Sequence, residues 1–145
     1  MLKVLIIEDD LMIADMLEEV LRANNYSVCG IATTVAEAVT LILREKPDLA
    51  IIDLRLADGG LGTDIVRQIV DKRDMGILYA TGNAASVVLT SANGHACISK
   101  PYSETSLLRA LNLVTEIMTT STASPPFPKG FKVLTSSQPE RSLNG

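Results

Sequence analysis

The stretch VLIIEDD, residues 4–10, places three acidic residues, Glu8, Asp9 and Asp10, directly after four branched aliphatic ones. A short run of branched aliphatic residues is typical of a buried β-strand. Carboxylates that stand close together repel one another and resist burial. The expected strand therefore ends either at a solvated turn that opens a helix or at a site that binds a cation. The rest of the chain has to decide between the two.

Short aliphatic runs alternate along the chain with amphipathic stretches of helical period. Most positions in each run are apolar, as expected for strands that are covered on both faces. The expected strands are residues 2–7, 27–32, 49–54, 76–80 and 96–99. Their strict alternation with helices predicts an α/β fold, a sandwich with a five-stranded parallel sheet and right-handed crossovers.

Local signals mark where the expected helices begin. Thr34 and Glu37 have the spacing of a capping box at the start of the second helix. Ser103 stands where it would cap the last helix. The stretch NAASVVLTSANG, residues 83–94, is the weakest expected helix, because β-branched residues are poor helix formers and Gly94 stops it.

The bulk composition narrows the class of protein. The 145 residues are 47% hydrophobic and 21% charged, with a formal net charge of −4. This length suits a single domain, and an acidic chain without a basic patch is not expected to bind nucleic acid directly. No apolar run approaches the roughly 20 residues of a membrane span, and the acidic N-terminus does not fit a secretory signal. We therefore expect a cytoplasmic protein.

The chain changes character after Thr119. Residues 120–145 hold four of the six prolines, many Ser and Thr residues and both phenylalanines. We expect residues 1–119 to form the folded domain and residues 120–145 to be a disordered tail, because such a composition buries too little apolar surface. The alternative is that PPFPKGFKVL, residues 125–134, docks on a partner or on the domain itself.

Chemically distinctive side chains follow four of the expected strands. In open parallel sheets, ligands bind beyond the carboxyl ends of the strands, where the strand order reverses. The residues at those ends are Glu8 and Asp9 after the first strand, Asp53 after the third, Thr81 after the fourth and Lys100 after the fifth. If these strands are neighbours, three carboxylates, a hydroxyl and an ammonium converge on one edge.

This set of groups suits phosphoryl transfer. A hard divalent cation with oxygen ligands lets the carboxylates remain ionised together, and Mg²⁺ is the usual choice. Asp53 is the best candidate nucleophile toward phosphorus, because it comes from the middle of the set. Lys100, Thr81 and the metal would stabilise the charge that gathers on the equatorial oxygens during transfer.

The chain resembles the receiver domain of two-component response regulators from residue 1 to about residue 119. Four motifs carry the resemblance: LIIEDD at 5–10, AIIDLRL at 50–56, ATG at 80–82 and SKPY at 99–102. The resemblance implies a flavodoxin-like, three-layer (βα)5 fold with strand order 2-1-3-4-5. In that order Cys29 and Cys97 lie on opposite edge strands about 19 Å apart, beyond the reach of a disulfide.

The resemblance also implies how the acidic residues act. Asp53 would accept a phosphoryl group from the phosphohistidine of a sensor histidine kinase or of a phosphotransfer protein. Glu8 and Asp9 would bind Mg²⁺ together with Asp53 and the backbone carbonyl of Arg55. Asp10 would have no metal role and would begin the first helix, where an acidic residue is favourable.

The remaining site residues take their roles from the same resemblance. Thr81 and Lys100 would bind the phosphoryl oxygens, and the Lys100–Pro101 peptide bond would be cis. Such a protein performs no conventional turnover and catalyses only its own phosphorylation and dephosphorylation. A stand-alone receiver with a short tail would then signal through protein–protein contacts, and Leu11, Met12 and Ala14 would form a kinase-docking patch beside the acids.

Finer features resemble a subgroup, the FATGUY receivers. Residues 79–82, Tyr-Ala-Thr-Gly, stand where that subgroup has Phe-Ala-Thr-Gly, and Ala57 stands where other receivers often have proline. One departure concerns the switch aromatic, three residues before the conserved lysine, because that position is Cys97 here. Tyr79 or Tyr102 would have to replace it, unless Tyr79 only packs and Tyr102 only caps the loop.

Two alternatives remain open at this point. One alternative is a degenerate receiver that acts as a constitutive interaction module, which the loss of the aromatic at Cys97 favours. A haloacid-dehalogenase-type phosphatase also uses aspartyl-phosphate chemistry. That class, however, has a second Asp two residues after its nucleophile, where this chain has Arg55, and the chain has no insertion long enough for a cap domain.

Overall fold

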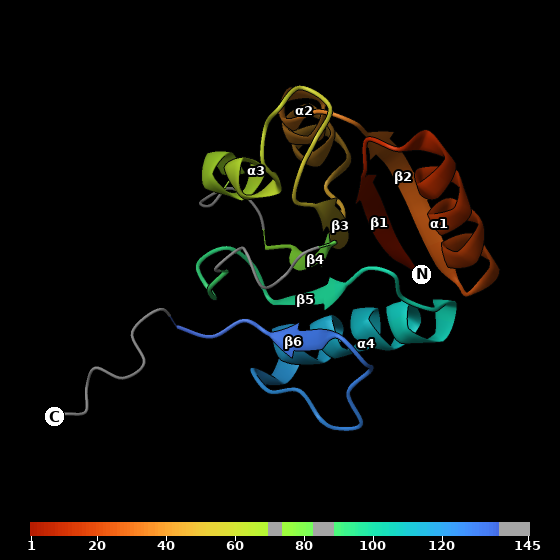
Figure 1. The fold of residues 1–145 in the computed structure, drawn as a ribbon, viewed down its shortest axis with the longest axis vertical. Helices are drawn as coiled ribbons and strands as arrows, with labels where there is room; N and C mark the ends of the chain where they lie inside the picture. The colour runs from red at the N-terminus through yellow and green to blue at the C-terminus, as the bar shows by residue number, and fades with distance from the viewer. Residues whose placement is uncertain (70–73, 83–88, 137–145) are drawn as a thin grey trace, which may run out of the picture.

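A computed structural model describes residues 1–69, 74–82 and 89–136, and six strands of this part of the chain form one sheet. The strands are β1 (Leu2–Ile7), β2 (Tyr26–Ala32), β3 (Leu49–Asp53), β4 (Gly76–Thr81), β5 (Ala96–Ser99) and β6 (Phe131–Val133). Their order is β2-β1-β3-β4-β5-β6, so the predicted order 2-1-3-4-5 is confirmed and one strand is added at the β5 edge (Figure 1). The first five strands are parallel, and β6 is antiparallel to β5.

Helices cover both faces of this sheet and complete the three-layer sandwich. They are α1 (Leu11–Ala23), α2 (Val35–Glu45), α3 (Gly62–Ile69) and α4 (Glu104–Thr120). Buried residues of α2 and α3 share one core cluster, and those of α1 and α4 share the other. No helix in the described part of the chain is both long and apolar enough to cross a membrane.

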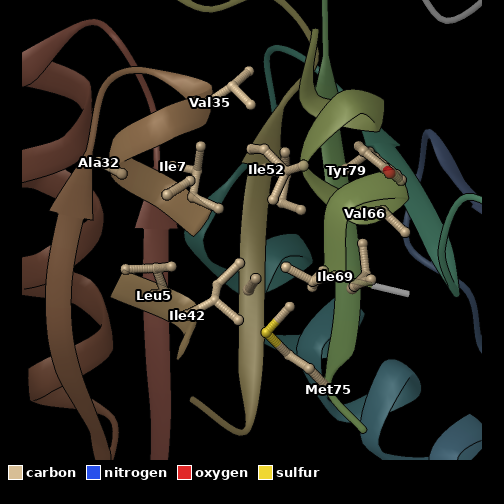
Figure 2. Packing of buried hydrophobic residues seen from close by; sticks show 14 of the residues in the cluster. Leu5, Ile7, Ala32, Val35, Ile42, Ile52, Val66, Ile69, Met75 and Tyr79 are labelled. Atoms are coloured by element: carbon tan, nitrogen blue, oxygen red, sulfur yellow. The ribbon is translucent and has the colours of Figure 1, made fainter. Parts of the chain in front are cut away.

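The aliphatic runs fill the core between these layers. Leu49, Ala50, Ile51 and Ile52 of β3 are each at most 2% exposed, because successive side chains point to opposite faces and both faces are covered. Figure 2 shows one of the two clusters, in which Ile52 lies among residues of β1, α2, α3 and β4. The near absence of polar alternation in the sequence is thus explained by burial on both sides.

The helix starts agree with the capping signals in the sequence. The Asp10 side chain accepts hydrogen bonds from the backbone N–H groups of Met12 and Ile13 at the start of α1. Thr34 caps α2 and Ser103 caps α4 in the same way. Each cap satisfies backbone donors that have no partner within the first turn.

The expected helix at residues 83–94 is wrong for the part that the structure describes. Residues 83–88 lie outside the described residues, and residues 89–95 form a turn without a helix. The turn lies tightly against β4, because the Tyr79 hydroxyl donates to the Asn93 carbonyl at 2.7 Å. A Cβ at Gly94 would come within 2.8 Å of side-chain atoms of Ile77 and Tyr79, so only glycine permits this close approach.

The expectation of a disordered tail does not hold for residues 131–133, which form β6. The alternative, docking on the domain itself, is what the structure has, because Phe131 to Val133 pair with Ile98 to Ala96 of β5. Leu134 follows the strand and is 5% exposed within the core cluster that contains Tyr79 and Cys97. Composition suggested a disordered segment, yet one buried leucine and a strand pairing hold it to the sheet.

The two cysteines lie far apart in the sheet, as predicted. Cys29 is on β2 and Cys97 is on β5, and both are free thiols. Because β6 pairs with β5, Cys97 is on an interior strand and not on the edge strand that the sequence predicted. Burial raises the pKa of both thiols, which makes them less reactive as nucleophiles.

Removing the Leu134 side chain tests whether the C-terminal strand is part of the fold. Because Leu134 is buried in the core, Leu134→Ala should lower the free energy of unfolding by about 2–4 kcal/mol. Urea unfolding of the full chain measures this loss. Leu43→Ala is the control, since Leu43 is 43% exposed and should cost much less. Equal stability of the Leu134→Ala variant and the unchanged chain would contradict the docking of this segment.

Candidate functional site

The register of the central strands brings Glu8 and Asp53 to the same edge of the sheet. Ile7 of β1 pairs with Ile52 of β3, so the residue after each one stands at the carboxyl end of the pair. The Glu8 N–H donates to the Ala32 carbonyl at 2.9 Å, which extends the pairing with β2 by one residue. One ligand oxygen each from Glu8, Asp9 and Asp53 lies within 4.8 Å of the others. The predicted convergence of the three carboxylates is therefore present.

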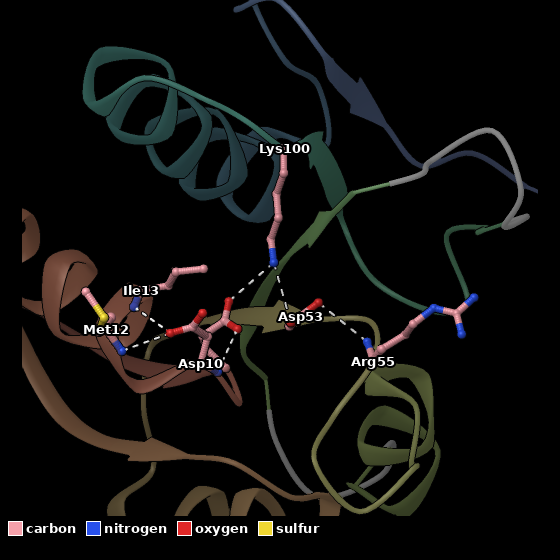
Figure 3. A network of polar contacts seen from close by, with 7 residues as sticks. Asp10, Met12, Ile13, Asp53, Arg55 and Lys100 are labelled. Atoms are coloured by element: carbon pink, nitrogen blue, oxygen red, sulfur yellow. Dashed lines mark hydrogen bonds and ion pairs between the residues drawn. The ribbon is translucent and has the colours of Figure 1, made fainter.

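Lys100 brings a positive charge to this acidic cluster. Its Nζ lies 3.4 Å from Glu8 Oε1 and 3.4 Å from Asp53 Oδ2 (Figure 3). Its backbone N–H donates to the Thr81 carbonyl at 2.8 Å, so the carboxyl ends of β4 and β5 are tied together. The peptide bond between Lys100 and Pro101 is cis, as the resemblance implies.

Burial makes the charge of Glu8 costly. The Glu8 residue is 3% exposed, and this burial raises the pKa of its carboxyl group to about 7. The charge of Asp53 adds to the rise in pKa, whereas the backbone N–H of Asp10 and the Lys100 ammonium lower it. The cluster holds three carboxylates and one ammonium, so a further cation would relieve the remaining repulsion.

The donor set fits a hard divalent metal ion. Carboxylate oxygens are the ligands that Mg²⁺ prefers, and it usually binds through one or two carboxylates while keeping several waters. Asp9 is exposed and Asp53 is partly exposed, so the cluster is open to solvent on one side. Asp10 is not part of the cluster, because its side chain caps α1, as predicted.

The loop after β3 supports Asp53 from the other side. The Arg55 backbone N–H donates to Asp53 Oδ1 at 3.4 Å, and Arg55 also forms an isolated bridge with Leu61. The start of α3 lies directly against this loop, since a Cβ at Gly62 would come within 2.6 Å of the Asp53 carbonyl oxygen. Sequence reasoning did not identify Gly62 as part of the site. Its only sequence feature is its position nine residues after Asp53.

Thr81 takes the position that the sequence predicted for it. It is the last residue of β4 and is 4% exposed. Its neighbour Ala80 pairs with Asp53, and Thr81 itself pairs with Ser99, the residue before Lys100. The four site strands thus bring Glu8, Asp9, Asp53, Thr81 and Lys100 to one edge of the sheet.

The two tyrosines differ in their relation to this site. Tyr79 is fully buried in the core with its hydroxyl bonded to Asn93, so it packs and does not reach the carboxylates. Tyr102 is half-buried, and burial raises its pKa to about 12, with the charges of Glu8 and Asp53 adding to the rise. Tyr102 is therefore the tyrosine that is electrostatically coupled to the site.

Comparison with protein families agrees with this geometry. The family model described as "Response regulator receiver domain" matches residues 4–112. The chain belongs to the response regulator receiver family. The match runs from within β1 to the middle of α4 and includes all of the residues at the acidic edge.

Curated relatives include regulators from two bacteria. The phyllosphere-induced regulator PhyR of Methylorubrum extorquens is 35% identical over 80 residues, which are 54% of this chain and 30% of that protein. The transcriptional regulatory protein PdtaR of Mycobacterium tuberculosis is 33% identical over 114 residues, 77% of this chain and 55% of that protein. The receiver therefore spans only part of each of these relatives.

Solved receiver structures share the fold. A CheY-like response regulator receiver domain protein from Methanospirillum hungatei superposes with a TM-score of 0.74 at 27% identity, covering 83% of this chain and 98% of that chain. The anti-anti-sigma factor PhyR from Bartonella quintana superposes with a TM-score of 0.61 at 30% identity, covering 71% of this chain and 42% of that chain. The predicted flavodoxin-like receiver fold is thus confirmed.

Replacing Glu8 by Gln should change how stability depends on pH. The folded pKa of Glu8, about 7, lies above its ordinary value of 4.5, so ionisation favours the unfolded chain. This contribution is fully present below pH 4.5 and is lost as the pH rises through about 7. In metal-free buffer, Glu8→Gln should match the unchanged chain at pH 4.5 and exceed its free energy of unfolding by up to about 3 kcal/mol at pH 8.

Urea unfolding across this pH range, with a chelator present, measures the difference. Asp15→Asn is the control, since Asp15 is exposed on α1 outside the acidic cluster. That variant should follow the pH profile of the unchanged chain. A Glu8→Gln profile parallel to that of the unchanged chain would show that burial of Glu8 does not strain the site.

Proposed function

We propose that this receiver accepts a phosphoryl group on Asp53 from the phosphohistidine of a sensor histidine kinase or of a phosphotransfer protein. The observation that carries the proposal is the meeting of Glu8, Asp9 and Asp53 within 4.8 Å, with the Lys100 ammonium 3.4 Å from two of the three. Membership of the receiver family supports it. Asp53 is the acceptor in this proposal because its carboxylate lies between the acids that follow β1 and the Thr81–Lys100 pair.

In the proposed reaction an Asp53 oxygen forms a bond to phosphorus while the bond from phosphorus to the donor histidine nitrogen breaks. The imidazole leaves with the electron pair and takes up a proton. Lys100 neutralises the charge that gathers on the transferred oxygens, and the Thr81 hydroxyl donates to one of them. Hydrolysis of the aspartyl phosphate returns Asp53 to its starting state, so the protein acts as a switch without conventional turnover.

Glu8, Asp9, Asp53 and the backbone carbonyl of Arg55 are proposed to hold Mg²⁺. When bound, Mg²⁺ would neutralise negative charge on the phosphoryl oxygens and on the acids that surround them. The raised pKa of Glu8 supports a cation here, because burial and the neighbouring charge of Asp53 make the ionised carboxylate costly without one. The longer glutamate arm stands where aspartate is more common in the family, and it still contributes an oxygen to the cluster.

A kinase or phosphotransfer helix is proposed to dock on α1. Leu11, Met12 and Met16 are 58%, 77% and 63% exposed on this helix, directly after the acids. Of these three, Met16 lines an apolar groove of about 500 Å³, which has Tyr102 and Leu107 on its other side. Ala14, which the sequence also placed in this patch, is fully buried against the sheet and does not belong to it.

A FATGUY-type receiver is proposed as the subgroup. Residues 79–82 and Ala57 support this assignment by sequence. The absence of an aromatic at Cys97 leaves Tyr102 as the proposed replacement, since its pKa responds to the site carboxylates. Tyr102 would then be the group that changes its contacts when Asp53 is phosphorylated.

The output of the switch is proposed to be contact with a downstream protein in the cytoplasm. The acidic net charge of −4 does not favour direct nucleic-acid binding. The PhyR protein of Bartonella quintana is described as an anti-anti-sigma factor, and this supports a protein target for a similar receiver.

Mass spectrometry of the intact protein after incubation with acetyl phosphate and Mg²⁺ tests the acceptor. The unchanged chain should gain one phosphoryl group, and Asp53→Asn should gain none, because Asp53 is the proposed acceptor, beside Lys100 and on the strand next to Thr81. Asp58→Asn is the matched control, since this exposed acid of the same loop lies outside the cluster and should leave labelling intact. A chelator should abolish labelling of the unchanged chain.

The same assay separates the alternatives. Phosphorylation of Asp53→Asn at another residue would refute the assignment of the acceptor. Binding of Mg²⁺ without any labelling would favour a degenerate interaction module, the alternative that the loss of the aromatic at Cys97 supports. Repeated hydrolysis of phosphate monoesters would favour a phosphatase.

A further inference from the structure

The C-terminal segment, residues 121–136, is bonded to both ends of β5. At the carboxyl end of the strand, the Ser99 N–H donates to the Gly130 carbonyl at 3.1 Å. At the amino end, the Leu134 N–H donates to the His95 carbonyl at 3.0 Å, and the Leu134 side chain is buried in the core. The segment therefore spans the whole of β5, the strand that delivers Lys100.

A second set of contacts fixes the start of the segment to α4. The Arg109 side chain donates from Nη2 to the Ser124 carbonyl at 2.7 Å and from Nε to the Pro126 carbonyl at 3.1 Å. The Ser124 N–H and hydroxyl both donate to the carboxylate of Glu116. These contacts lie on the surface. The segment is thus held by surface polar bonds, by the buried Leu134 and by Phe131, which packs against the core.

The bond from Ser99 to Gly130 connects the segment with the acidic cluster. Ser99 is followed by Lys100, whose backbone donates to Thr81 and whose ammonium lies 3.4 Å from both Glu8 and Asp53. Gly130 has a φ of +80°, and a Cβ there would come within 3.2 Å of Ser99 Cβ. Glycine is thus required for the chain to turn this closely against the residue beside Lys100.

We propose that docking of the C-terminal segment on β5 is linked to the state of Asp53 and tightens when Asp53 carries a phosphoryl group. The inference rests on the proposed function. In the unphosphorylated protein, Lys100 divides its contacts between two carboxylates at 3.4 Å. A phosphoryl group adds negative charge beside Asp53, so it draws Lys100 and Thr81 inward and orders the ends of β4 and β5. Because Ser99 and His95 hold the segment, a more ordered β5 binds it more tightly.

The linkage is reciprocal by thermodynamic necessity. If occupation of the Asp53 site raises the equilibrium constant for docking of the segment by some factor, then undocking lowers the affinity of the Asp53 site for its ligand by the same factor. The C-terminal segment is in this way a regulatory element of the receiver. Docking of the segment thus responds to phosphorylation of Asp53 and in turn changes how strongly the Asp53 site binds a phosphoryl mimic.

Amide hydrogen exchange of the full chain, compared with and without beryllofluoride and Mg²⁺, measures this linkage. Beryllofluoride serves as a stable mimic of the phosphoryl group on Asp53. Three amides report docking. The Ser99 N–H donates to Gly130 and the Ser91 N–H donates to Thr135 of the segment, whereas the Leu134 N–H of the segment donates to His95. Saturation at Asp53 should slow their exchange by at least about five-fold, the lower end of typical coupling between sites. Unchanged or faster exchange at saturation would overturn the proposal.

Gly130→Ala interrupts the connection without removing the segment. The added Cβ should disturb the contact with Ser99, so beryllofluoride should no longer slow exchange at Leu134 and should bind more weakly, by the same factor. Gly59→Ala is the control, because Gly59 has a φ of +81° and no atom within 4 Å of an added Cβ. That variant carries similar backbone strain and should keep the full effect. Loss of the effect in Gly59→Ala as well would overturn the assignment to the Ser99 contact.

Failure of this inference is distinguishable from failure of the proposed function. Labelling of Asp53 by acetyl phosphate reports the acceptor chemistry by itself. Labelling with unchanged exchange at Ser99, Leu134 and Ser91 would overturn the linkage alone. Absence of labelling would overturn the acceptor assignment, and the linkage with it.

Discussion

The repulsion among three carboxylates at one edge of the sheet is the constraint on which the rest of this receiver depends. The core places β1 beside β3, and this pairing brings the carboxylates of Glu8 and Asp53 close together. Lys100 offsets part of the repulsion, and burial, with the charge of Asp53 adding to it, still raises the pKa of Glu8 to about 7. A cation bound between these carboxylates would stabilise the site, and this stabilisation is the physical reason to expect metal-dependent phosphoryl chemistry here.

Much of the architecture was predictable because its determinants are local. Strands buried on both faces need nearly continuous aliphatic residues, and that requirement appears directly in the sequence as the runs at β1, β3 and β4. The caps at Asp10, Thr34 and Ser103 involve only neighbours within three residues. Once parallel strands are adjacent, the side chains after their carboxyl ends must gather at one edge, so the candidate site followed from the strand pattern.

The features that sequence reasoning missed depend on contacts between distant parts of the chain. Residues 89–95 turn against β4 because Gly94 lacks a Cβ and because Asn93 accepts from the Tyr79 hydroxyl. Neither contact has a periodic signal. The composition of residues 120–145 averages over many polar positions, whereas the docking of this segment depends on the burial of Leu134, the packing of Phe131 and the pairing with β5.

These two differences from expectation belong to the same region of the core. Tyr79 of β4, Cys97 of β5 and Leu134 of the C-terminal segment share one cluster, on the face of the sheet that α2 and α3 cover. Cys97 is small where the family usually has an aromatic residue, and Leu134 supplies apolar volume beside it. In the proposed switch, Tyr102 takes the role of the missing aromatic, and the segment docked along β5 is a second element whose contacts depend on the state of Asp53.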